Sequence, residues 1–302
     1  MLKLGIIGLG DIAAKAYLPV ISSMKELELH LFTRNEEKLE EISQRYRFSN
    51  IHPSLKFLIK SGINAAFVHS STESHYEIVK ELLLNDIHVY VDKPITYHFE
   101  TTKELVEIAE TRKLILMTGF NRRFAPAYQA LREVVNPNML IMQKNRHSLP
   151  GDIRTFVFDD FIHVIDTVRY LMNDDEILNL IVHGRKKGDL LYHVTAQFFS
   201  NDSTGIAIMN RDSGSEEEKV EIMGPDEKRT VHNLTDLIIH SNNKDTKLSF
   251  NNWDTTLFKR GFEQIIAEFI TSVRTNTFPS VSTLNSLLTH EICEKIVREL
   301  EN

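Results

Sequence analysis

The sequence predicts an α/β fold in two halves, the first of which is a doubly wound parallel sheet. Three observations support this class. An apolar strand at the N-terminus runs into a glycine turn, strand and helix patterns alternate as far as Thr118, and several strands with few helices between them dominate the second half. A chain of 302 residues is long enough for two domains with a sizeable core.

The first turn carries the strongest local pattern. The apolar run Leu4–Ile7 stops at Gly8-Leu9-Gly10, and an amphipathic stretch begins at Asp11. Gly8 permits a tight turn, Gly10 lets the backbone approach phosphates, and a helix N-terminus offers free N–H groups. The third glycine of the usual pattern is Ala13, a small residue accepted there. The pattern favours a dinucleotide pyrophosphate site over an ordinary turn between strand and helix.

The rest of the first half alternates regularly. Strands are predicted at Leu2–Ile7, Leu29–Phe32, Ala65–His69, Val89–Val91 and Leu114–Met117. Helices are predicted at Glu36–Tyr46, His75–Leu84 and Phe99–Thr111. Right-handed crossovers place the carboxyl ends of such strands on one edge of a parallel sheet, with helices on both faces, and a ligand crevice forms at that edge.

After Gly119 the pattern changes. A helix is predicted over 161–172, and two more over Trp253–Val273 and Leu284–Leu300. Strand-like runs lie at Ile177–His183, Leu190–Phe199, Gly205–Met209, Lys219–Met223 and Arg229–His232. Because few helices separate these runs, we expect a mostly antiparallel sheet. We therefore predict a dinucleotide-binding domain over 1–120 and a substrate and oligomerisation domain over 121–302.

Composition excludes several classes of protein. The net charge of −7 argues against general nucleic-acid binding. No apolar run is long enough to span a membrane, and the glycines and Asp11 interrupt the N-terminal run, which does not suit an export signal. The lone Cys293 allows no disulfide within the chain, which fits a reducing compartment. We expect a cytoplasmic enzyme with a small-molecule substrate and neither a membrane nor a nucleic-acid partner.

The end of the second strand indicates the type of cofactor. NAD enzymes usually place an acid there to bind the ribose 2′-hydroxyl, but this strand ends Phe32-Thr33-Arg34. The Thr33 hydroxyl and the Arg34 guanidinium suit a 2′-phosphate, because arginine offers several charge-assisted donors. NADP is therefore preferred over NAD, unless Arg34 is only a solvated charge at the start of a helix.

A polar turn follows the strand at Ala65–His69. Ser70 and Ser71 stand at its carboxyl edge, where small polar residues can face a nucleotide. Ser74 is a candidate cap of the next helix. His75 is either part of this site or a surface residue at the start of that helix.

The next strand ends in Asp92-Lys93-Pro94. Lysine is seldom buried without a partner, and a crevice can lower its pKa towards useful acid/base range. Pro94 restricts the backbone of Lys93 and permits a cis bond between them. The alternative is a surface turn with a solvated lysine.

In the second half, Asp159 and His163 are four residues apart, and if this stretch is helical they share one face. A carboxylate that orients an imidazole gives a proton donor or acceptor near neutral pH. No companion cysteine or histidine has the spacing of a metal ligand, so we predict no metal. The alternative is a capped helix whose histidine has an ordinary structural partner.

Taken together, these segments resemble the Gfo/Idh/MocA oxidoreductase family. The matching motifs are Gly8-Leu9-Gly10-Asp11-Ile12-Ala13, Ser70–His75, Asp92-Lys93-Pro94, Asn121-Arg122-Arg123 and Asp159-x-x-x-His163. They span nearly the whole chain, and the stretch from Asp159 to Thr167 is most similar to the MviM-type branch. The resemblance implies an N-terminal Rossmann domain and a C-terminal α+β domain. The open, largely antiparallel sheet of that second domain often supports homodimers or homotetramers.

The resemblance also implies roles for single residues. Lys93 and His163 would be catalytic, with Asp159 pairing with His163 or binding substrate. Together with the residue-level arguments, the predicted cofactor contacts are Gly8, Gly10, Asp11, Ile12, Thr33, Arg34, Ser70, Ser71, His75, Asp92, Lys93 and Arg122. The predicted substrate contacts are Lys93, Asn121, Asp159 and His163.

Two positions depart from the family pattern. Asp92 replaces the commoner glutamate, and Phe161 stands where many relatives have glycine, which puts a generic sugar substrate in doubt. The leading hypothesis is an NADP- or NAD-dependent oxidoreductase that moves a hydride between nicotinamide and a carbinol carbon of a sugar, cyclitol or related polyhydroxy compound. One alternative is a catalytically silent cofactor-binding sensor or regulator. Another is a reductase of an unsaturated or tetrapyrrole-like substrate, similar to biliverdin reductase.

Overall fold

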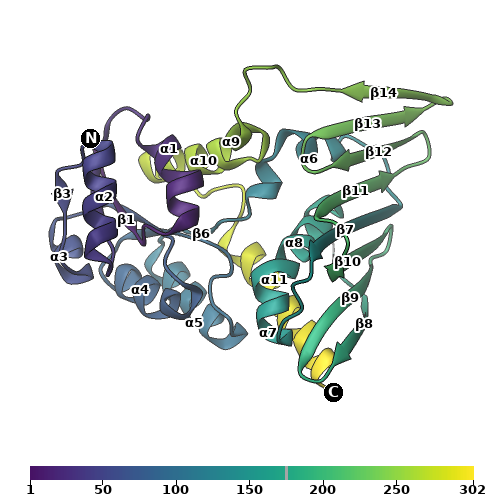
Figure 1. The fold of residues 1–302 in the computed structure, drawn as a ribbon, viewed down its shortest axis with the longest axis horizontal. Coiled ribbons are helices and arrows are strands. Elements are labelled where there is room, and N and C mark those ends of the chain that lie inside the picture. Colours follow the sequence, from purple (N-terminus) through teal and green to yellow (C-terminus); the bar gives the residue numbers. More distant parts are fainter. Residues whose placement is uncertain (174–175) are drawn as a thin grey trace. The chain divides into compact units, whose positions relative to one another are not determined.

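The computed structural model describes residues 1–173 and 176–302 of the chain. The chain divides into two compact units. The first comprises residues 1–119 and 262–288, and the second comprises residues 120–261 and 289–302. Each unit has its own central sheet (Figure 1).

A six-stranded sheet forms the centre of the first unit. Its order is β3-β2-β1-β4-β5-β6, and neighbouring strands are parallel throughout. The strands are β1 (Leu2–Ile7), β2 (Leu27–Phe32), β3 (Asn50–Ile51), β4 (Ala65–Val68), β5 (His88–Val91) and β6 (Leu116–Thr118). The direction of winding reverses between β1 and β4, and doubly wound sheets bind ligands beyond the carboxyl ends of such strands. The predicted parallel sheet is confirmed.

Helices lie on both faces of this sheet. They are α1 (Leu18–Ile21), α2 (Glu36–Tyr46), α3 (Leu55–Lys60), α4 (Thr72–Leu84), α5 (Phe99–Arg112) and α10 (Phe262–Thr275). A π-helical turn, η1 (Ala13–Tyr17), directly precedes α1. Local chemistry sets where some of them begin. The Asn35 side chain caps α2 by accepting the Lys38 N–H at 2.9 Å, because the first N–H groups of a helix have no partner within it.

Alternation along β4 and β5 divides the core of this unit between the two faces. Val68 and Val91 pack into an apolar cluster with residues of α4 and α5. Phe67 and Tyr90 directly precede these valines and point to the other face of the sheet. Their rings lie 5.0 and 5.6 Å from the ring of Phe269 in α10. Strands buried on both faces read as continuous apolar runs, as these do.

The packing of α10 explains why the observed division differs from the expected one of 1–120 and 121–302. Phe262 lies edge-on to Tyr17 at 5.5 Å, and Arg274 donates to the Lys25 carbonyl at 3.0 Å. This helix therefore returns to the first unit from late in the sequence. Its amphipathic pattern predicts a helix but does not identify the sheet that it covers.

An eight-stranded sheet forms the second unit, in the order β14-β13-β12-β11-β7-β10-β9-β8. The strands are β7 (Met139–His147), β8 (Asn179–Lys187), β9 (Leu190–Phe199), β10 (Thr204–Ser213), β11 (Glu217–Met223), β12 (Glu227–His232), β13 (Asp236–Ser241) and β14 (Lys244–Leu248). Of the described pairs, β7 and β10 run parallel and the others antiparallel. The largely antiparallel sheet is confirmed, and with it the α/β fold class.

One face of this sheet is covered by helices (Figure 1). The helical segments are η2 (Asn121–Phe124), α6 (Pro126–Leu131), α7 (Ile153–Thr155), η3 (Phe156–Phe161), α8 (Ile162–Leu171), α9 (Thr256–Lys259) and the end of α11 (Thr283–Glu301). One close approach is at Gly205, where a Cβ atom would lie 2.6 Å from Val168 of α8 and from Met172. Glycine there lets α8 pack directly on β10.

No described helix covers the other face. Ile181, Gln197, Ile206 and Ile141 form one cross-strand row on it. Ile181 is 50% exposed, while Ile141 and Ile206 are half-buried. This open face is therefore partly apolar.

The sequence patterns missed several features of the second unit, among them strands β13 and β14. Strand β7 was not predicted, because its second half, Gln143–His147, is polar; inside it, Lys144 and Asn145 are buried. The predicted helix Trp253–Val273 is divided at Gly261, whose φ is +79°. A Cβ atom there would lie 2.3 Å from the Asn121 carbonyl oxygen, so the break is fixed by a close backbone approach. Among the described helices, none is long and apolar enough to cross a bilayer.

Candidate functional site

The first unit has a cavity of about 500 Å³ at the carboxyl edge of its sheet. Six residues predicted to contact the cofactor line it: Gly8, Gly10, Thr33, Arg34, Ser70 and Ser71. Apolar side chains close one part of it, among them Phe32, Leu55 and Ile78. The structure therefore brings residues from three separate strand ends to one place, as a doubly wound sheet requires.

The glycine turn has the shape that a dinucleotide needs. Gly8 has a φ of +82°, and a Cβ atom on it would lie 2.5 Å from the Ser70 backbone nitrogen. Around Gly10, by contrast, a Cβ atom would meet no atom within 4 Å. The first glycine thus lets the two turns touch, and the second leaves open space beside the backbone. That space suits a pyrophosphate, so the residues present fit a nicotinamide dinucleotide.

Asp11 and Ile12 follow this turn, and both are exposed. The Asp11 carboxylate accepts from Lys15 Nζ at 2.7 Å, and this exposed pair lowers the pKa of Asp11. Neither side chain lines the cavity. Their predicted contacts with the cofactor stay predictions.

Arg34 is exposed at the rim of the cavity, next to Thr33. Glu77 of α4 lines the same cavity, and sequence reasoning did not identify it. It has no local signal, because an exposed glutamate on a helix is ordinary. The cavity therefore has one cationic and one anionic side chain in its lining.

The turn after β4 is held by its own hydrogen bonds. Ser74 Oγ donates to Ser70 Oγ at 2.9 Å and also lies 2.8 Å from the Ser71 carbonyl. Ser71 is the residue that precedes α4, and its side chain makes no capping hydrogen bond. Ser74 lies inside the helix, so the prediction that it caps α4 is wrong. His75 is 1% exposed, which rules out the alternative of a surface histidine. Its ring bridges the carbonyls of Ser70 and Pro94, both at 3.0 Å.

Asp92 and Lys93 lie half-buried directly after β5, and the Lys93–Pro94 bond is cis. Tyr17 Oη donates to Asp92 Oδ1 at 3.3 Å, and His69 Nδ1 lies 3.6 Å from Asp92 Oδ2. Burial raises the pKa of Asp92, but His69 and the charge of Lys93 lower it further, so the net shift is downward. The carboxylate is therefore ionised.

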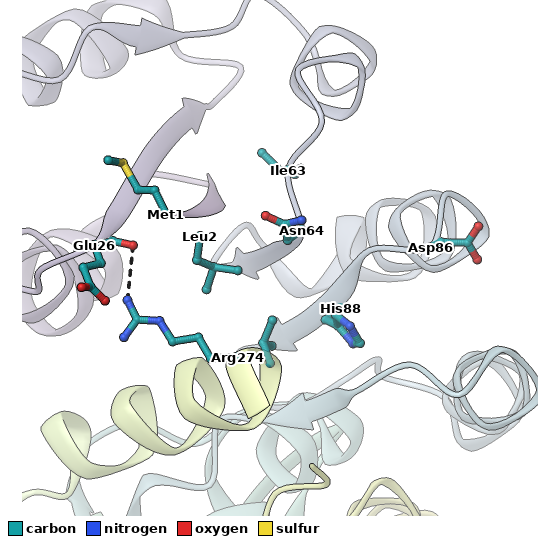
Figure 2. A pocket seen from close by; sticks show the side chains of 9 residues that line it. Met1, Leu2, Glu26, Ile63, Asn64, Asp86, His88 and Arg274 are labelled. Carbon is teal, nitrogen blue, oxygen red and sulfur yellow. Dashed lines mark hydrogen bonds between the residues drawn. The ribbon is translucent and has the colours of Figure 1, made fainter. Parts of the chain in front are cut away.

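A second cavity of about 570 Å³ lies at the opposite edge of this sheet (Figure 2). Leu2 and His88 line it at the starts of β1 and β5, and Arg274 reaches across to the Glu26 carbonyl at 3.3 Å. No residue predicted for the site lies there. Parallel sheets of this kind bind ligands at their carboxyl edge, so we do not assign the reaction to this cavity.

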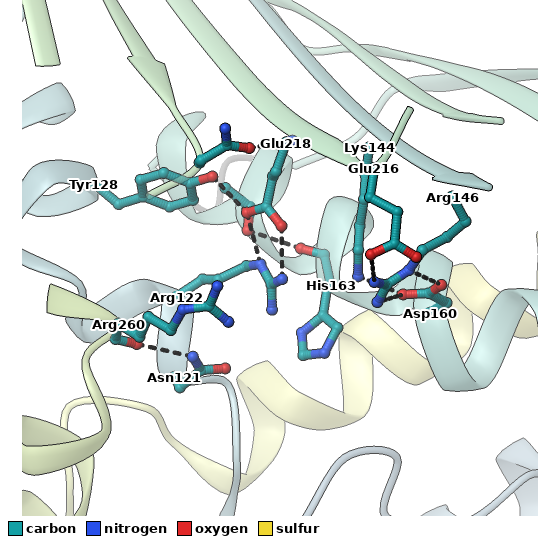
Figure 3. A network of polar contacts seen from close by, with 12 residues as sticks. Asn121, Arg122, Tyr128, Lys144, Arg146, Asp160, His163, Glu216, Glu218 and Arg260 are labelled. Atoms are coloured by element: carbon teal, nitrogen blue, oxygen red, sulfur yellow. Dashed lines mark hydrogen bonds and ion pairs between the residues drawn. The ribbon is translucent and has the colours of Figure 1, made fainter. Parts of the chain in front are cut away.

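The second unit holds a network of buried charges (Figure 3). Arg122 donates to both carboxylate oxygens of Glu218 through Nε at 2.8 Å and Nη2 at 2.6 Å. Tyr128 Oη donates to the same carboxylate at 2.5 Å. Burial raises the pKa of Glu218, but the Arg122 charge and its hydrogen bonds lower it further. Arg122, predicted as a cofactor contact, is thus engaged with Glu218, and its role at the cofactor stays a prediction.

Next to this pair, Lys144 and Arg146 of β7 both bind the Asp160 carboxylate, with Arg146 Nε at 3.0 Å. Burial, reinforced by the charge of Arg122, lowers the pKa of Lys144 to about 7. The two cations outweigh the burial of Asp160 and lower its pKa. A cavity of about 290 Å³ adjoins the network and is lined by Arg122, Lys144, Asn145, Arg146, Glu216, Glu217, Glu218, Asn233, Leu234 and Arg260.

Asp159 and His163 are half-buried beside this network. Asp159 lies in the π-helical turn η3 and His163 in the first turn of α8. Figure 3 shows the His163 imidazole pointing away from the sheet, on the same side as the Arg122 guanidinium. Asn121 is buried, and its Nδ2 donates to the Arg260 carbonyl at 2.8 Å. The helix predicted over 161–172 begins one turn earlier in π form, a geometry frequent at functional sites.

Two family models match the chain. Residues 2–120 match the Gfo/Idh/MocA oxidoreductase family with an NAD-binding Rossmann fold, and residues 126–242 match the YceM-like C-terminal domain. Over 99% of its length the chain is 32% identical to YceM of Salmonella typhimurium, of which it covers 98%. The chain belongs to the Gfo/Idh/MocA family of oxidoreductases.

Other members of the Gfo/Idh/MocA family show the same likeness. The crystal structure of the dehydrogenase MviM from Clostridium difficile is 34% identical, with a TM-score of 0.93 and 99% of each chain covered. Myo-inositol 2-dehydrogenase of Thermotoga maritima is 23% identical over 93% of this chain and 91% of its own. The predicted family, and an oxidoreductase with an NAD-binding fold, are confirmed.

In this Gfo/Idh/MocA chain, the sequence patterns did not identify the buried charged residues Glu218 and Lys144, which lie next to predicted site residues. Glu218 belongs to a run of three glutamates that reads as a solvated surface, yet it is 6% exposed. Lys144 alternates with Leu140 and Met142 on the buried side of β7, and that alternation was the available signal. Phe161 has no exposed surface and belongs to the core. Over the described ranges, no group of three histidine, cysteine, aspartate or glutamate side chains is arranged to hold a metal.

Proposed function

We propose that the chain transfers a hydride between a nicotinamide cofactor and a carbinol carbon of a sugar, cyclitol or related polyhydroxy compound. The observation that carries this proposal is the cavity at the carboxyl edge of β1, β2 and β4, lined by six of the predicted cofactor residues. The relative from Thermotoga maritima, named a myo-inositol 2-dehydrogenase, supports a polyhydroxylated substrate.

The proposed chemistry divides between cofactor and protein. When bound, the nicotinamide exchanges a hydride with the carbinol carbon. In the oxidation direction, Lys93 and His163 accept or relay the proton of the reacting hydroxyl. Asp159 orients the His163 imidazole, and Asn121 contributes to substrate binding. A group held within hydrogen-bond reach of that proton accelerates the step by positioned proton transfer.

The charge network of the second unit supports a polyhydroxylated ligand. The cations Arg122, Lys144 and Arg146 already have carboxylate partners, so they offer N–H donors without a large net positive charge. The carboxylates beside them offer acceptors. Hydroxyl groups both donate and accept, and therefore match a wall of paired charges better than an ion does.

We infer a preference for NADP over NAD. Arg34 and Thr33 line the cavity where the 2′-phosphate of NADP would lie, and β2 ends without an acid. Glu77 lines the same cavity and would repel a phosphate beside it. The balance between Arg34 and Glu77 therefore sets the preference. The lone buried Cys293 supports a reducing cytoplasm as the compartment.

The partly apolar open face of the second sheet supports a homodimer or homotetramer formed through it. Its row of Ile181, Ile206 and Ile141 would be buried between two copies. Exposed apolar patches of this kind are typical of protein interfaces. A closed dimer would pair the same face of both copies.

Turnover tests the proposal directly. Purified protein is mixed with NADP or NAD and a panel of cyclitols, aldoses and sugar acids, and the reduced nicotinamide is followed by its absorbance. With a reacting compound, Lys93→Ala should lower turnover by about 100-fold or more, because a positioned proton acceptor is lost. Lys60→Ala, at an exposed lysine on α3, is the matched control and should leave turnover unchanged.

Cofactor affinity should survive in Lys93→Ala, since the cavity itself is intact. Equal turnover of Lys93→Ala and the wild type would contradict the role of Lys93. Cofactor binding without hydride exchange for any polyhydroxy compound would favour a catalytically silent sensor instead.

A further inference from the structure

The short loop that carries Lys93 is held from both sides by buried side chains. On its C-terminal side, His75 Nδ1 lies 3.0 Å from the Pro94 carbonyl oxygen. The other ring nitrogen, Nε2, lies 3.0 Å from the Ser70 carbonyl oxygen in the cofactor turn. His75 projects from α4, one turn after its start, and is 1% exposed. One imidazole therefore ties the turn after β4 to the loop after β5.

Both partners of His75 are carbonyl acceptors. Burial lowers the pKa of His75 more than these two contacts raise it, so the ring is neutral near physiological pH. A neutral imidazole has a single N–H and donates to one carbonyl at a time. A side chain with two N–H donors on one atom, such as glutamine, would preserve at least one of these contacts.

On the N-terminal side of Lys93, the Asp92 carboxylate is held by Tyr17 and His69. A carboxylate accepts only, so Tyr17 Oη donates to Asp92 Oδ1 at 3.3 Å. The hydroxyls of Tyr17 and Tyr90 lie 2.8 Å apart, and Tyr90 is then the donor to Tyr17. Burial raises the pKa of both tyrosines, which keeps the hydroxyls protonated.

His69 completes this group without a hydrogen bond of its own. Its side chain has no exposed surface, and Nδ1 and Nε2 have no hydrogen-bond partner in the described part of the chain. Nδ1 lies 3.6 Å from Asp92 Oδ2, and the ring stacks on Tyr17 with centroids 3.8 Å apart. A buried unpaired polar group is costly and rare in native proteins, and a functional role is one reason for keeping it.

Gly119 of the chain passes close to Asp92 and its two tyrosine neighbours. A Cβ atom on Gly119 would lie 2.9 Å from Asp92 Oδ1, 3.0 Å from Tyr90 Oη and 3.3 Å from Tyr17 Oη. Any residue larger than glycine at position 119 would therefore push against Asp92 and the two tyrosine hydroxyls.

We propose that Tyr17, His69 and His75 are positioning residues that hold Asp92 and Pro94, and thereby hold Lys93 against the cofactor turn. The inference rests on the proposed catalytic role of Lys93. It gives His75 a role other than the predicted cofactor contact, because its ring nitrogens are directed at two carbonyls. It also joins cofactor binding at Ser70 to the placement of Lys93 through one side chain.

The test measures how fast Lys93 reacts in the cofactor-free protein. Trace labelling with acetic anhydride, quantified by peptide mass spectrometry, gives the rate at Lys93 relative to exposed Lys60. His75→Phe keeps the size of the ring and removes both nitrogens. We expect Lys93 to react about fivefold faster or more in this variant, because the loop loses its contact with His75 and the half-buried amine becomes more accessible.

Two further variants separate positioning from general loosening. His75→Gln retains N–H donors and should restore a rate within about twofold of wild type. His88→Gln is the matched control: it changes a half-buried histidine at the start of the same strand, β5, and should leave the labelling of Lys93 unchanged. With a reacting substrate, His75→Phe should lower kcat by about tenfold or more while KM for the cofactor changes less than about threefold.

An unchanged labelling rate at Lys93 in folded His75→Phe would overturn the proposal. If His75→Phe does not fold, Tyr17→Phe takes its place. This variant removes one hydroxyl and should also raise the labelling rate of Lys93. An unchanged rate in Tyr17→Phe would then overturn the proposal. A titration of the wild type with NADPH on the same samples separates this inference from the proposed function. Failure to bind NADPH would contradict the proposed function. The labelling ratio in the cofactor-free protein tests whether His75 and its neighbours position Lys93.

Discussion

Gly8 and Gly10 belong to one turn, but the space around them differs. A Cβ atom on Gly8 would collide with the Ser70 backbone, at a φ of +82°. On Gly10 it would enter open space. Glycine at position 8 therefore serves the fold, and glycine at position 10 serves a ligand.

The two alanine variants should separate these roles. Gly8→Ala should lower the free energy of unfolding by about 2 kcal/mol or more, through backbone strain and the collision with Ser70. Gly10→Ala should leave that free energy unchanged or raise it by up to about 1 kcal/mol. It should nevertheless weaken NADPH binding by about tenfold or more, because the new methyl group stands where the pyrophosphate approaches. Urea unfolding and a fluorescence titration measure the two effects, and equal destabilisation by both substitutions would contradict this assignment.

At this scale the sequence predicted those parts of the site that have a local pattern. Gly8, Gly10, Thr33, Arg34, Ser70 and Ser71 stand at strand ends in a regular alternation, and all six line one cavity. Glu77 lines it too, without any such signal, and His69 lines it at the end of a predicted strand although it was not assigned to the site. Hydrophobic periodicity does not describe tertiary packing. It therefore does not predict that Glu77 on α4 faces the sheet edge or that the His69 ring packs against Asp92.

At the scale of single elements, the predictions were best where the pattern was strongest. The helix predicted over Glu36–Tyr46 has those bounds in the structure, and so does the strand predicted over Leu190–Phe199. Strand β7 was missed because its buried Lys144 and Asn145 are polar. Two carboxylates distant in sequence support this burial, because Asp160 accepts from Lys144 and Glu217 accepts from the Asn145 Nδ2 group.

The open sheet face gives a prediction about assembly. If two copies associate through it, Ile206→Glu should shift the protein to monomers, because burying an unpaired carboxylate between two copies is costly. Leu84→Glu is the control, since Leu84 is an apolar residue 47% exposed at the end of α4 in the first unit. Sedimentation velocity measures the mass of each variant. An unchanged oligomer in Ile206→Glu, or dissociation by Leu84→Glu, would contradict an interface at this face.

At the scale of the whole molecule, the two-part architecture was predictable, but the path of the chain between the parts was not. The first unit consists of residues 1–119 and a second segment, residues 262–288. The return of residues 262–288 to the first unit depends on contacts of Phe262 and Phe269 with Tyr17, Phe67 and Tyr90. Such long-range packing leaves no mark in the local pattern.

Stability of the whole chain should depend on pH through three histidines, the buried His75 and the half-buried His52 and His88. Burial lowers the pKa of His52, His75 and His88 in the folded state. The unfolded chain, with histidine pKa values near about 6.5, therefore takes up more protons as the pH falls. This contribution to stability is present above about pH 6.5 and is lost as the pH falls through the folded pKa values.

Urea unfolding at about pH 7.5 and about pH 5.5 measures this loss, and we expect a lower free energy of unfolding at the acidic value. The pKa values of Asp160 and Glu218 are also lowered, but these carboxylates lose their contribution only below about pH 5, outside this window. Equal free energies at the two pH values would contradict lowered pKa values of these three histidines in the folded state.

The most direct test of the central claim is a fluorescence titration with NADPH and NADH of the wild type, Arg34→Gln and Glu77→Gln. We predict that the wild type binds NADPH more tightly than NADH. Arg34→Gln should lose about tenfold or more in NADPH affinity, through one charge-assisted contact, and Glu77→Gln should gain affinity for it. Binding of neither nucleotide, or NADPH affinity indifferent to both substitutions, would contradict a nicotinamide site in this cavity.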